Sequence, residues 1–289
     1  MSIEASAKTV ETNKNVELTE KRGKKMKKSF KGLQSIGLPV VALLLFFAVW
    51  QVGVQMLGIQ PFILPKPTDI IASAVENYAN LWNSVIRTIT SAVIGFLLSV
   101  VVGITGAVIL SSSRVVQDSL YPYAVLLQTV PIVAIAPIIV IWFGSGMNAI
   151  VIIAFIIGFF PMLSNTLVGL NSTDHNMTNL FQLYSANRWQ MMFKLRFPAA
   201  LPYIMAGLRI SCTMAITGAI VGEYVAGIGG GEGGLGYSIT VASARLQTAY
   251  LFALGLASSI LGILFFALIN GFSKWVLGSW HESEMKSEN

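Results

Sequence analysis

The sequence predicts an all-α polytopic membrane protein that crosses the bilayer six times. Of its 289 residues, 54% are hydrophobic and 11% are charged, whereas an ordinary soluble domain carries about 25% charged residues. Six apolar runs are long enough to span, and because a backbone in lipid must satisfy its own hydrogen bonds, they are expected to be helices. The runs lie at 36–57, 86–111, 119–143, 148–170, 200–225 and 250–275.

The chain begins with a polar, basic segment, 1–34, that we expect to be a cytoplasmic tail. It holds nine of the 19 basic residues and directly precedes the first apolar run. That position favours a topology signal and contact with a lipid membrane over nucleic-acid binding, because no groove-reading motif follows. The first run is long enough to span and has no small-residue cleavage site after it, so a cleavable signal peptide is not expected.

Basic residues also predict the orientation. With the N-terminus inside, the cytoplasmic segments hold 15 Lys and Arg residues and the outer segments hold three, so both termini are expected in the cytoplasm. The predicted division is a first transmembrane helix at 35–58, an extracytoplasmic segment at 59–85, a five-helix core at 86–276 and a cytoplasmic tail at 277–289. Inside the core we expect a cytoplasmic loop at 171–199 and an outer glycine-rich loop at 226–249.

The outer loop contains "GIGGGEGGLGY" (227–237), which has seven glycines. It lacks the Lys-Ser/Thr ending of a phosphate-binding loop and is predicted to face outward, so no nucleotide site is expected there. We predict instead that Gly233 and Gly234 shape an outer gate. Glu223, just before the run, is favoured as a structural acceptor that holds the glycine segment, with a place in the translocation path as the alternative.

Arg209 is the basic residue inside the fifth apolar run. We expect it to reach toward cytoplasmic headgroups or to brace a helix contact. The alternative is a cation that faces an anionic solute.

The cytoplasmic loop is the most informative segment. Asp174 is a predicted helix N-cap, and large aromatic residues such as Trp189 and Phe193 lie outside any spanning run. One interpretation is a helix on the bilayer surface. The other is a docking element whose aromatic side chains enter a pocket of a cytoplasmic partner.

Short motifs in this region resemble the so-called EAA loop in permease subunits of bacterial ABC importers. The matching residues are "SANRWQ" (185–190), "FPAALP" (197–202) and "GLR" (207–209). Segments elsewhere resemble the nitrate/sulfonate/taurine branch of this superfamily: "FILPKPTDI" (62–70), "TVPIVAIAPIIVIWFGSGM" (129–147), "GEYVAG" (222–227) and "GLGYSI" (234–239). The forms "LYSANRWQ" and "KLRFPAALPY" are similar to members associated with thiamine-pyrimidine or riboflavin uptake.

This resemblance implies a type I importer permease of the bacterial inner membrane. Two copies of the chain would form the pathway, two cytoplasmic ABC ATPase subunits would grip the loop, and an extracytoplasmic solute-binding protein would deliver the solute. The solute would be a nitrate/sulfonate/taurine-like anion or a thiamine-pyrimidine/riboflavin-like heterocycle. ATP would be bound by the separate ATPase, so the chain itself needs no cofactor. The implied docking residues are Leu183, Tyr184, Ser185, Ala186, Asn187, Arg188, Trp189, Gln190, Phe193, Pro198 and Pro202.

The loop departs from the family pattern at two places. Asn179-Leu180-Phe181 replaces Glu-Ala-Ala, and Ser185 replaces a glycine, so either Ser185 or Asn187 is expected to carry the positive φ of the turn. We also expect Pro198 and Pro202 to stop the short docking helix.

Two other classes of protein compete with this interpretation. The first is an ATPase-independent secondary transporter or channel, which more often has many more spans and internal repeats. The second is a membrane receptor or anchor, against which the clustered prolines count. The sequence presents no acid pair, nucleophile triad or metal-ligand cluster, so neither enzymatic activity nor a metal site is expected.

Overall fold

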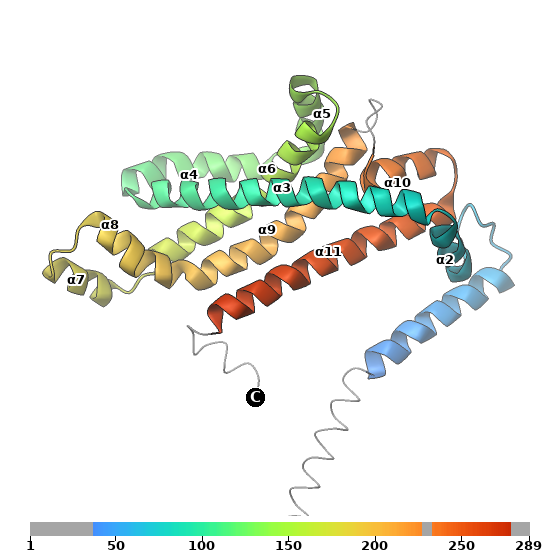
Figure 1. Cartoon of the computed structure of the whole chain (residues 1–289), viewed down its shortest axis with the longest axis horizontal. Coiled ribbons are helices and arrows are strands. Elements are labelled where there is room, and N and C mark those ends of the chain that lie inside the picture. The colour runs from blue at the N-terminus through green and yellow to red at the C-terminus, as the bar shows by residue number, and fades with distance from the viewer. Residues whose placement is uncertain (1–36, 227–232, 279–289) are drawn as a thin grey trace, which may run out of the picture. The chain divides into compact units, whose positions relative to one another are not determined.

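The computed structural model describes residues 37–226 and 233–278, and every regular element in these two ranges is a helix (Figure 1). The chain divides into two compact units, 1–69 and 70–289. Each unit is described by itself.

The described part of the first unit is an apolar helix followed by a short connection. The helix, Gly37–Met56, has a mean hydropathy of 2.1 over 20 residues, which is long enough to cross a membrane. Gln51 on this helix ties down the connection, because its Nε2 donates to Thr68 Oγ1 (3.2 Å) and its Oε1 accepts from the Thr68 backbone N–H (3.4 Å). Pro67 opens α2 (Pro67–Glu76), a position where the missing N–H of proline costs nothing.

The second unit contains the remaining helices. They are α3 (Tyr78–Ser111), α4 (Arg114–Thr129), α5 (Ile132–Phe143), α6 (Met147–Asn171), α7 (His175–Leu183), α8 (Arg188–Met191), a π-helix (Met192–Arg196), α9 (Phe197–Ala226), α10 (Leu235–Ala244) and α11 (Thr248–Leu277). The region expected as an extracytoplasmic segment therefore contains α2 and the start of α3, and the region expected as an outer loop contains α10.

The core of the second unit is formed by α3, α6 and α9, which lie side by side (Figure 1). Small residues let their backbones approach closely, as in other membrane helix bundles. A Cβ on Gly218 of α9 would lie 2.8 Å from the Cα of Ala154 on α6, so that position has room only for glycine. Hydroxyl groups add direct links: Ser99 donates to the Phe155 carbonyl (2.9 Å) and Ser211 to the Gly158 carbonyl (2.7 Å).

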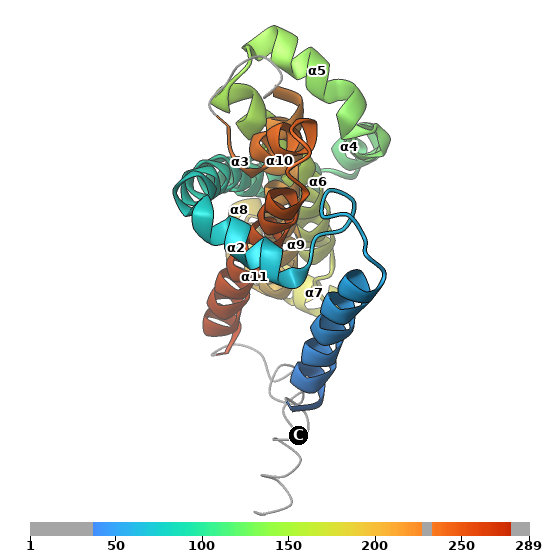
Figure 2. The same ribbon diagram turned by 90° about the vertical axis from the view of Figure 1, so that its right-hand side faces the viewer.

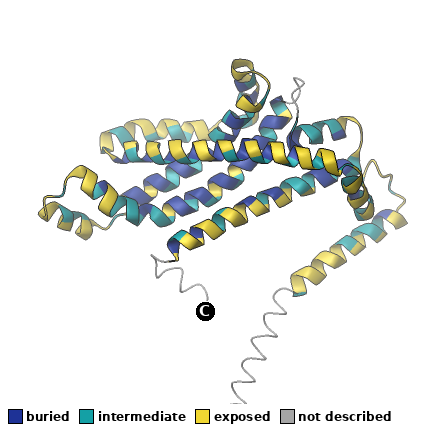
Figure 3. Cartoon of the chain, viewed as in Figure 1, coloured by how far each residue is buried: buried dark blue, intermediate teal, exposed yellow. Residues whose placement is uncertain are grey.

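The outward faces of α3 and α11 are apolar and exposed. In Figure 3 the dark blue of buried residues follows the facing sides of α6 and α9, while much of α3 and α11 is exposed. Val101 on α3 and Leu268 on α11 are 63% and 70% exposed. Because lipid tails are as apolar as leucine, such faces suit a bilayer.

The apolar run predicted as the third span, 119–143, is interrupted in the structure. That region forms two helices, α4 and α5, which meet at an angle of 97°. The break is at Pro131, and Val130 before it is extended (φ −73°, ψ 125°), as a residue preceding proline prefers. In Figure 2, α4 and α5 form a bent arm, and α5 packs on the core, because Ala136 and Ile139 share a buried cluster with Ala149 and Ile153 of α6. Among the described residues five helices are long and apolar enough to span, and a sixth span results if the bent pair counts as one.

Candidate functional site

Two regions predicted to be functional lie at opposite ends of α9. Most of the docking residues, from Leu183 to Phe193, precede its first residue, Phe197, and Glu223 lies near its last residue, Ala226 (Figure 1). A helix of this length extends about 45 Å at 1.5 Å per residue. A movement of the docking residues can therefore be transmitted to the Glu223 region through one continuous helix.

The cytoplasmic loop begins with a capped helix, as predicted. The Asp174 carboxylate accepts from the Asn176 backbone N–H (2.7 Å), which confirms Asp174 as the N-cap of α7. This bond satisfies one of the N–H groups that a helix leaves unpaired at its start. The direction in which α7 leaves the end of α6 is thus fixed.

A tight turn at Ser185 ends α7. Ser185 has φ of +54°, whereas Asn187 has φ of −74°, so of the two expected positions Ser185 carries the left-handed conformation. Ser185 N–H donates to the Gln182 carbonyl (2.9 Å), and Ala186 N–H donates to the Phe181 carbonyl (3.0 Å). This is the paired pattern of a Schellman motif, in which glycine is usual. The turn forms without glycine, with Ser185 in a conformation that L-residues disfavour.

The next helix, α8, starts with a reciprocal capping box. The Asn187 side chain accepts from Gln190 N–H (2.7 Å), and the Gln190 side chain accepts from Asn187 N–H (2.9 Å). Two unpaired backbone donors are satisfied at once, which fixes this four-residue helix. The spacing Asn-x-x-Gln was visible in the sequence and was the signal that could have located the helix start.

An exposed aromatic pair lies on this helix and the π-helix. The rings of Trp189 and Phe193 stack with centroids 5.9 Å apart and planes 11° apart. Their side chains remain 69% and 61% exposed, and Leu183 and Tyr184 of the preceding turn are more exposed still. We call these four side chains the docking patch. Several large apolar side chains exposed on one short loop mark contact with a partner or with lipid.

The docking helix is not stopped by Pro198 and Pro202, contrary to prediction. Helical structure continues from Arg188 to Ala226, and both prolines lie inside it. The five-residue spacing of the π-helix directly before Pro198 relieves the clash that a proline ring makes with the carbonyl four residues earlier. Arg196, the last residue of the π-helix, donates through Nη1 to the Ser111 carbonyl at the end of α3 (3.2 Å). The docking patch is therefore built on a continuous helix that is also tied to α3.

At the far end of α9, Glu223 holds the start of α10. Glu223 is 2% exposed, and its Oε2 accepts from Thr88 Oγ1 (2.9 Å) and from the Gly236 backbone N–H (2.9 Å). Thr88 Oγ1 in turn accepts from the Leu235 N–H (2.8 Å). The N-cap of α10, Gly234, has no side chain to offer, so side chains from α3 and α9 satisfy its first donors.

These contacts confirm Glu223 as a structural acceptor for the segment that starts at Gly233. The remainder of the glycine run, 227–232, lies outside the described residues. Thr88 was missed, because a threonine inside an apolar run gives no signal that a residue far along the chain will meet it.

Gly233, Gly234 and Gly236 are required because other groups lie too close to leave room for a side chain. A Cβ on Gly234 would overlap the Glu223 carboxylate, and a Cβ on Gly236 would overlap the Ile220 carbonyl. A Cβ on Gly233 would overlap the Tyr237 ring. The buried carboxylate can reach the N-terminus of α10 only because these positions carry no side chain.

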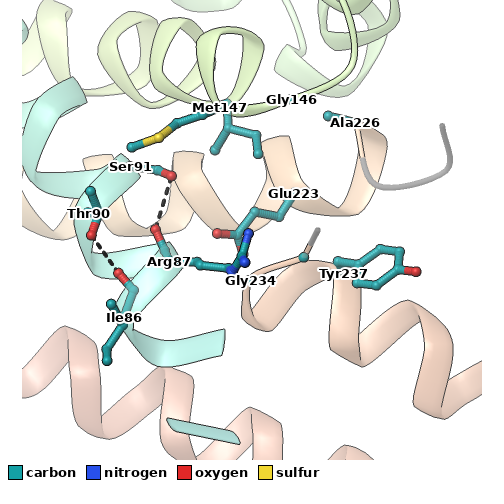
Figure 4. A pocket seen from close by; sticks show the side chains of 12 residues that line it. Ile86, Arg87, Thr90, Ser91, Gly146, Met147, Glu223, Ala226, Gly234 and Tyr237 are labelled. Atoms are coloured by element: carbon teal, nitrogen blue, oxygen red, sulfur yellow. Dashed lines mark hydrogen bonds between the residues drawn. The ribbon is translucent and has the colours of Figure 1, made fainter. Parts of the chain in front are cut away.

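A cavity of about 340 Å³ lies beside this network (Figure 4). Its walls come from α3, the start of α6, the end of α9 and α10, and both predicted glycines line it together with Glu223. Among the described residues, Glu223 Oε1 has no hydrogen-bond partner. Figure 4 shows Arg87 extending from α3 toward the Glu223 carboxylate, a residue that sequence reasoning did not select.

Arg209 belongs to neither region. It is half-buried, and its Nη2 donates to the Ser273 hydroxyl of α11. This contact supports the expectation that it braces a helix pair. Among the described residues, no group of three or more His, Cys, Asp or Glu side chains is placed to hold a metal ion.

Apolar spans, a bent helical arm and an organised polar loop together define a multi-pass membrane transport subunit. Residues 95–278 match the family described as "Binding-protein-dependent transport system inner membrane component", and the chain belongs to this family. It is accordingly a permease subunit of an ABC importer for a small solute.

Two relatives cover almost the whole chain. The chain is 33% identical to the formylaminopyrimidine transport permease protein ThiX of Halalkalibacterium halodurans over 90% of its own length and 100% of the relative. It is 34% identical to the riboflavin transport system permease protein RibX of Chloroflexus aurantiacus over 86% of its length and 91% of the relative. Among solved structures, the MetNI methionine ABC transporter in an inward-facing conformation matches 70% of this chain and 98% of its own chain, with a TM-score of 0.59 and 16% identity.

Proposed function

We propose that this permease works with two cytoplasmic ABC ATPase subunits that dock on the docking patch. The observation that carries this proposal is the stacked pair of Trp189 and Phe193, which is exposed on a capped helix that continues into a membrane span. Aromatic residues held rigidly on such a helix suit insertion into a partner's pocket. ATP binds the ATPase subunits, and the permease itself takes no cofactor.

The orientation follows from the same proposal. The docking patch and both termini face the cytoplasm, and the Glu223 region faces outward. The positive-inside excess of Lys and Arg supports this arrangement. An extracytoplasmic solute-binding protein delivers the solute at the outer end, in line with the family's dependence on a binding protein.

Two copies of the chain form the pathway. The arm of α4 and α5 exposes large apolar residues, among them Ile141 (79%) and Trp142 (73%), outside the packed core. A second copy would cover part of this surface, which a lone chain leaves to lipid.

The solute is a small heterocycle rather than an inorganic or sulfonate anion. The relatives named for formylaminopyrimidine and riboflavin are 33% and 34% identical to this chain, whereas those named for aliphatic sulfonates, nitrate and taurine are 26–29% identical. Arg209, the candidate for contact with an anion, is half-buried and bonded to Ser273.

The Glu223 region is the outer gate. A carboxylate that fixes the start of α10 beside a cavity can hold a closed state, and loss of its contacts would let α10 move. Gly233 and Gly234 allow the close approach on which this state depends.

The docking proposal is tested by co-purification and uptake. Tagged permease is isolated from its native host, and uptake of labelled riboflavin, aminopyrimidine, taurine and nitrate is measured in the same cells. Trp189→Ala should remove both the ATPase and uptake. Trp275→Ala is the matched control, since this tryptophan is equally exposed but lies on α11. Uptake that survives without ATPase would establish the secondary transporter or channel instead, and equal loss in both variants would count against the docking patch.

A further inference from the structure

Two adjoining cavities lie between α4 and α6, on the side of the bundle where the docking loop leaves the membrane. One measures about 550 Å³ and is lined by polar and charged residues, and the other measures about 380 Å³. They share Gln117 and Asn171 in their walls. The two cavities therefore adjoin at these two residues, and we call them together the groove, with a polar cavity at one end and a more apolar cavity at the other.

Two polar pairs hold α4 against α6 along this groove. Asn171 Nδ2 donates to Gln117 Oε1 (3.1 Å), and the hydroxyls of Tyr121 and Ser164 are 3.3 Å apart. The helices are thus joined through side chains rather than by close backbone packing, which leaves the space between them open.

The polar cavity carries positive charge. Arg114 opens α4, and Arg196 is fixed beside the cavity by its bond to the Ser111 carbonyl. An arginine side chain has five N–H donors. Because the bond to Ser111 uses one of them, most of the N–H donors of Arg196 remain for a ligand. Two guanidinium groups on one cavity favour a phosphate, which they can bind in a bidentate manner. Asp118 places a carboxylate on the same cavity and opposes the binding of an anion.

The two ends of the groove suit the two parts of a phospholipid. α3 ends at Ser111 and α6 ends at Asn171, so the polar cavity lies where apolar helices leave the bilayer. Leu167 and Val168, which line the second cavity together with Tyr121, lie one turn further inside. A headgroup would meet the arginines while an acyl chain followed the apolar residues. Basic pockets between spans on the cytoplasmic side are known to take anionic headgroups in this way.

We propose that this groove binds one anionic phospholipid. Its phosphate lies against Arg114 and Arg196, and one acyl chain runs along Tyr121, Leu167 and Val168. The site shares no lining residue with the Glu223 cavity and none with the docking patch. Its occupation would fix α4, and through Arg196 the end of the docking helix, in the bilayer.

Photocrosslinking of lipid to the full-length permease tests this site. The chain is placed in phosphatidylcholine nanodiscs that contain a trace of phosphatidylglycerol with a photoactivatable acyl chain, and crosslinked residues are identified by mass spectrometry. Crosslinks are expected on Tyr121, Leu167 or Val168. Photoactivatable phosphatidylcholine should give no enrichment there, and equal labelling by both lipids would overturn the proposal.

Variants that each remove one charge are expected to change the crosslinking yield in a direction set by the sign of that charge. Arg114→Ala should lower the crosslinking yield about fivefold, as expected for one basic side chain at an anionic lipid. Asp118→Asn should raise the yield, because it removes the opposing carboxylate. Lys274→Ala is the matched control: it removes an exposed basic residue from the last turn of α11, outside the groove, and should leave the yield unchanged. If Arg114→Ala and Lys274→Ala lower the yield equally, only general surface charge is at work and the site is refuted.

A competition experiment distinguishes binding of a lipid from binding of soluble phosphate. Inorganic phosphate in excess should leave the acyl-chain crosslinks in place, since the apolar half of the groove adds to lipid binding. Complete displacement by inorganic phosphate would assign the arginines to a soluble anion and overturn the lipid proposal. None of these measurements depends on uptake or on the ATPase, so their outcome is distinct from that of the docking test.

Discussion

Oε2 of Glu223 and Oγ1 of Thr88 are joined by a 2.9 Å hydrogen bond between residues 135 positions apart, and both side chains are buried. The same two atoms accept from the first backbone N–H groups of α10. α3, α9 and α10 therefore meet at one small polar cluster within an apolar bundle. Glu223 Oε2 and Thr88 Oγ1 each bond to more than one partner, so loss of one side chain leaves other polar groups buried without a partner.

The first prediction concerns the hydroxyl of Thr88. Thr88→Val should destabilise the protein by about 1–3 kcal/mol, because the Leu235 N–H loses its acceptor and Glu223 loses a donor. Thr88→Ser keeps the hydroxyl and should retain most of the stability. Thermal unfolding in detergent measures the change. Thr105→Val is the control, since this exposed hydroxyl on the same helix bonds only to its own helix at the Val101 carbonyl. Equal effects of Thr88→Val and Thr105→Val would refute the role of the cluster.

The second prediction concerns the glycines that face Glu223. Gly234→Ala and Gly236→Ala should each cost about 1–3 kcal/mol of stability through overpacking, and should reduce uptake while ATPase binding is retained. Gly255→Ala on α11 is the matched control. No atom lies within 4 Å of a Cβ placed there, so it should be neutral or stabilising by about 0.5–1 kcal/mol. Loss of ATPase binding together with uptake would indicate global misfolding and not a defect of the gate.

The third prediction concerns the capping box of α8. Asn187→Ala should weaken the affinity for the ATPase about fivefold, since loss of a cap costs about 1 kcal/mol and loosens the helix that carries Trp189. Binding of purified ATPase to permease in nanodiscs measures this change. Asn179→Ala removes the same side chain from an exposed site on α7 and serves as the comparison. If both variants bind with the affinity of the parent protein, a fixed α8 is not needed for docking.

The fourth prediction concerns Ser185. Its φ of +54° disfavours a β-branched side chain, so Ser185→Val should destabilise the turn by about 1–3 kcal/mol. Ser185→Gly should be tolerated and should preserve ATPase binding. Hydrogen exchange at the Ser185 and Ala186 amides, which close the turn, reports its opening directly. Faster exchange in the glycine variant than in the valine variant would contradict this account.

The sequence allowed prediction of those features that depend on local pattern. Apolar runs located the spans, and the polar start of α7 located Asp174, because hydrophobicity and capping act over a few residues. The 97° break at Pro131 could not be predicted, since hydropathy measures how apolar a segment is and not the direction in which it runs. Proline suggested a kink, but its angle depends on the tertiary packing around α4 and α5. The hydrogen bond between Thr88 and Glu223 could not be predicted either, because it forms only after three helices have packed.

Two of the bonds described above join the same pair of helices at their two ends. Arg196, the last residue of the π-helix that continues into α9, bonds to Ser111 of α3 beside the docking patch, and Glu223 and Thr88 connect α9 to α3 at the far end of α9. The two helices are therefore linked near both ends, and these links resist sliding of one helix past the other. A pull on the docking patch would therefore move α3 and α9 together.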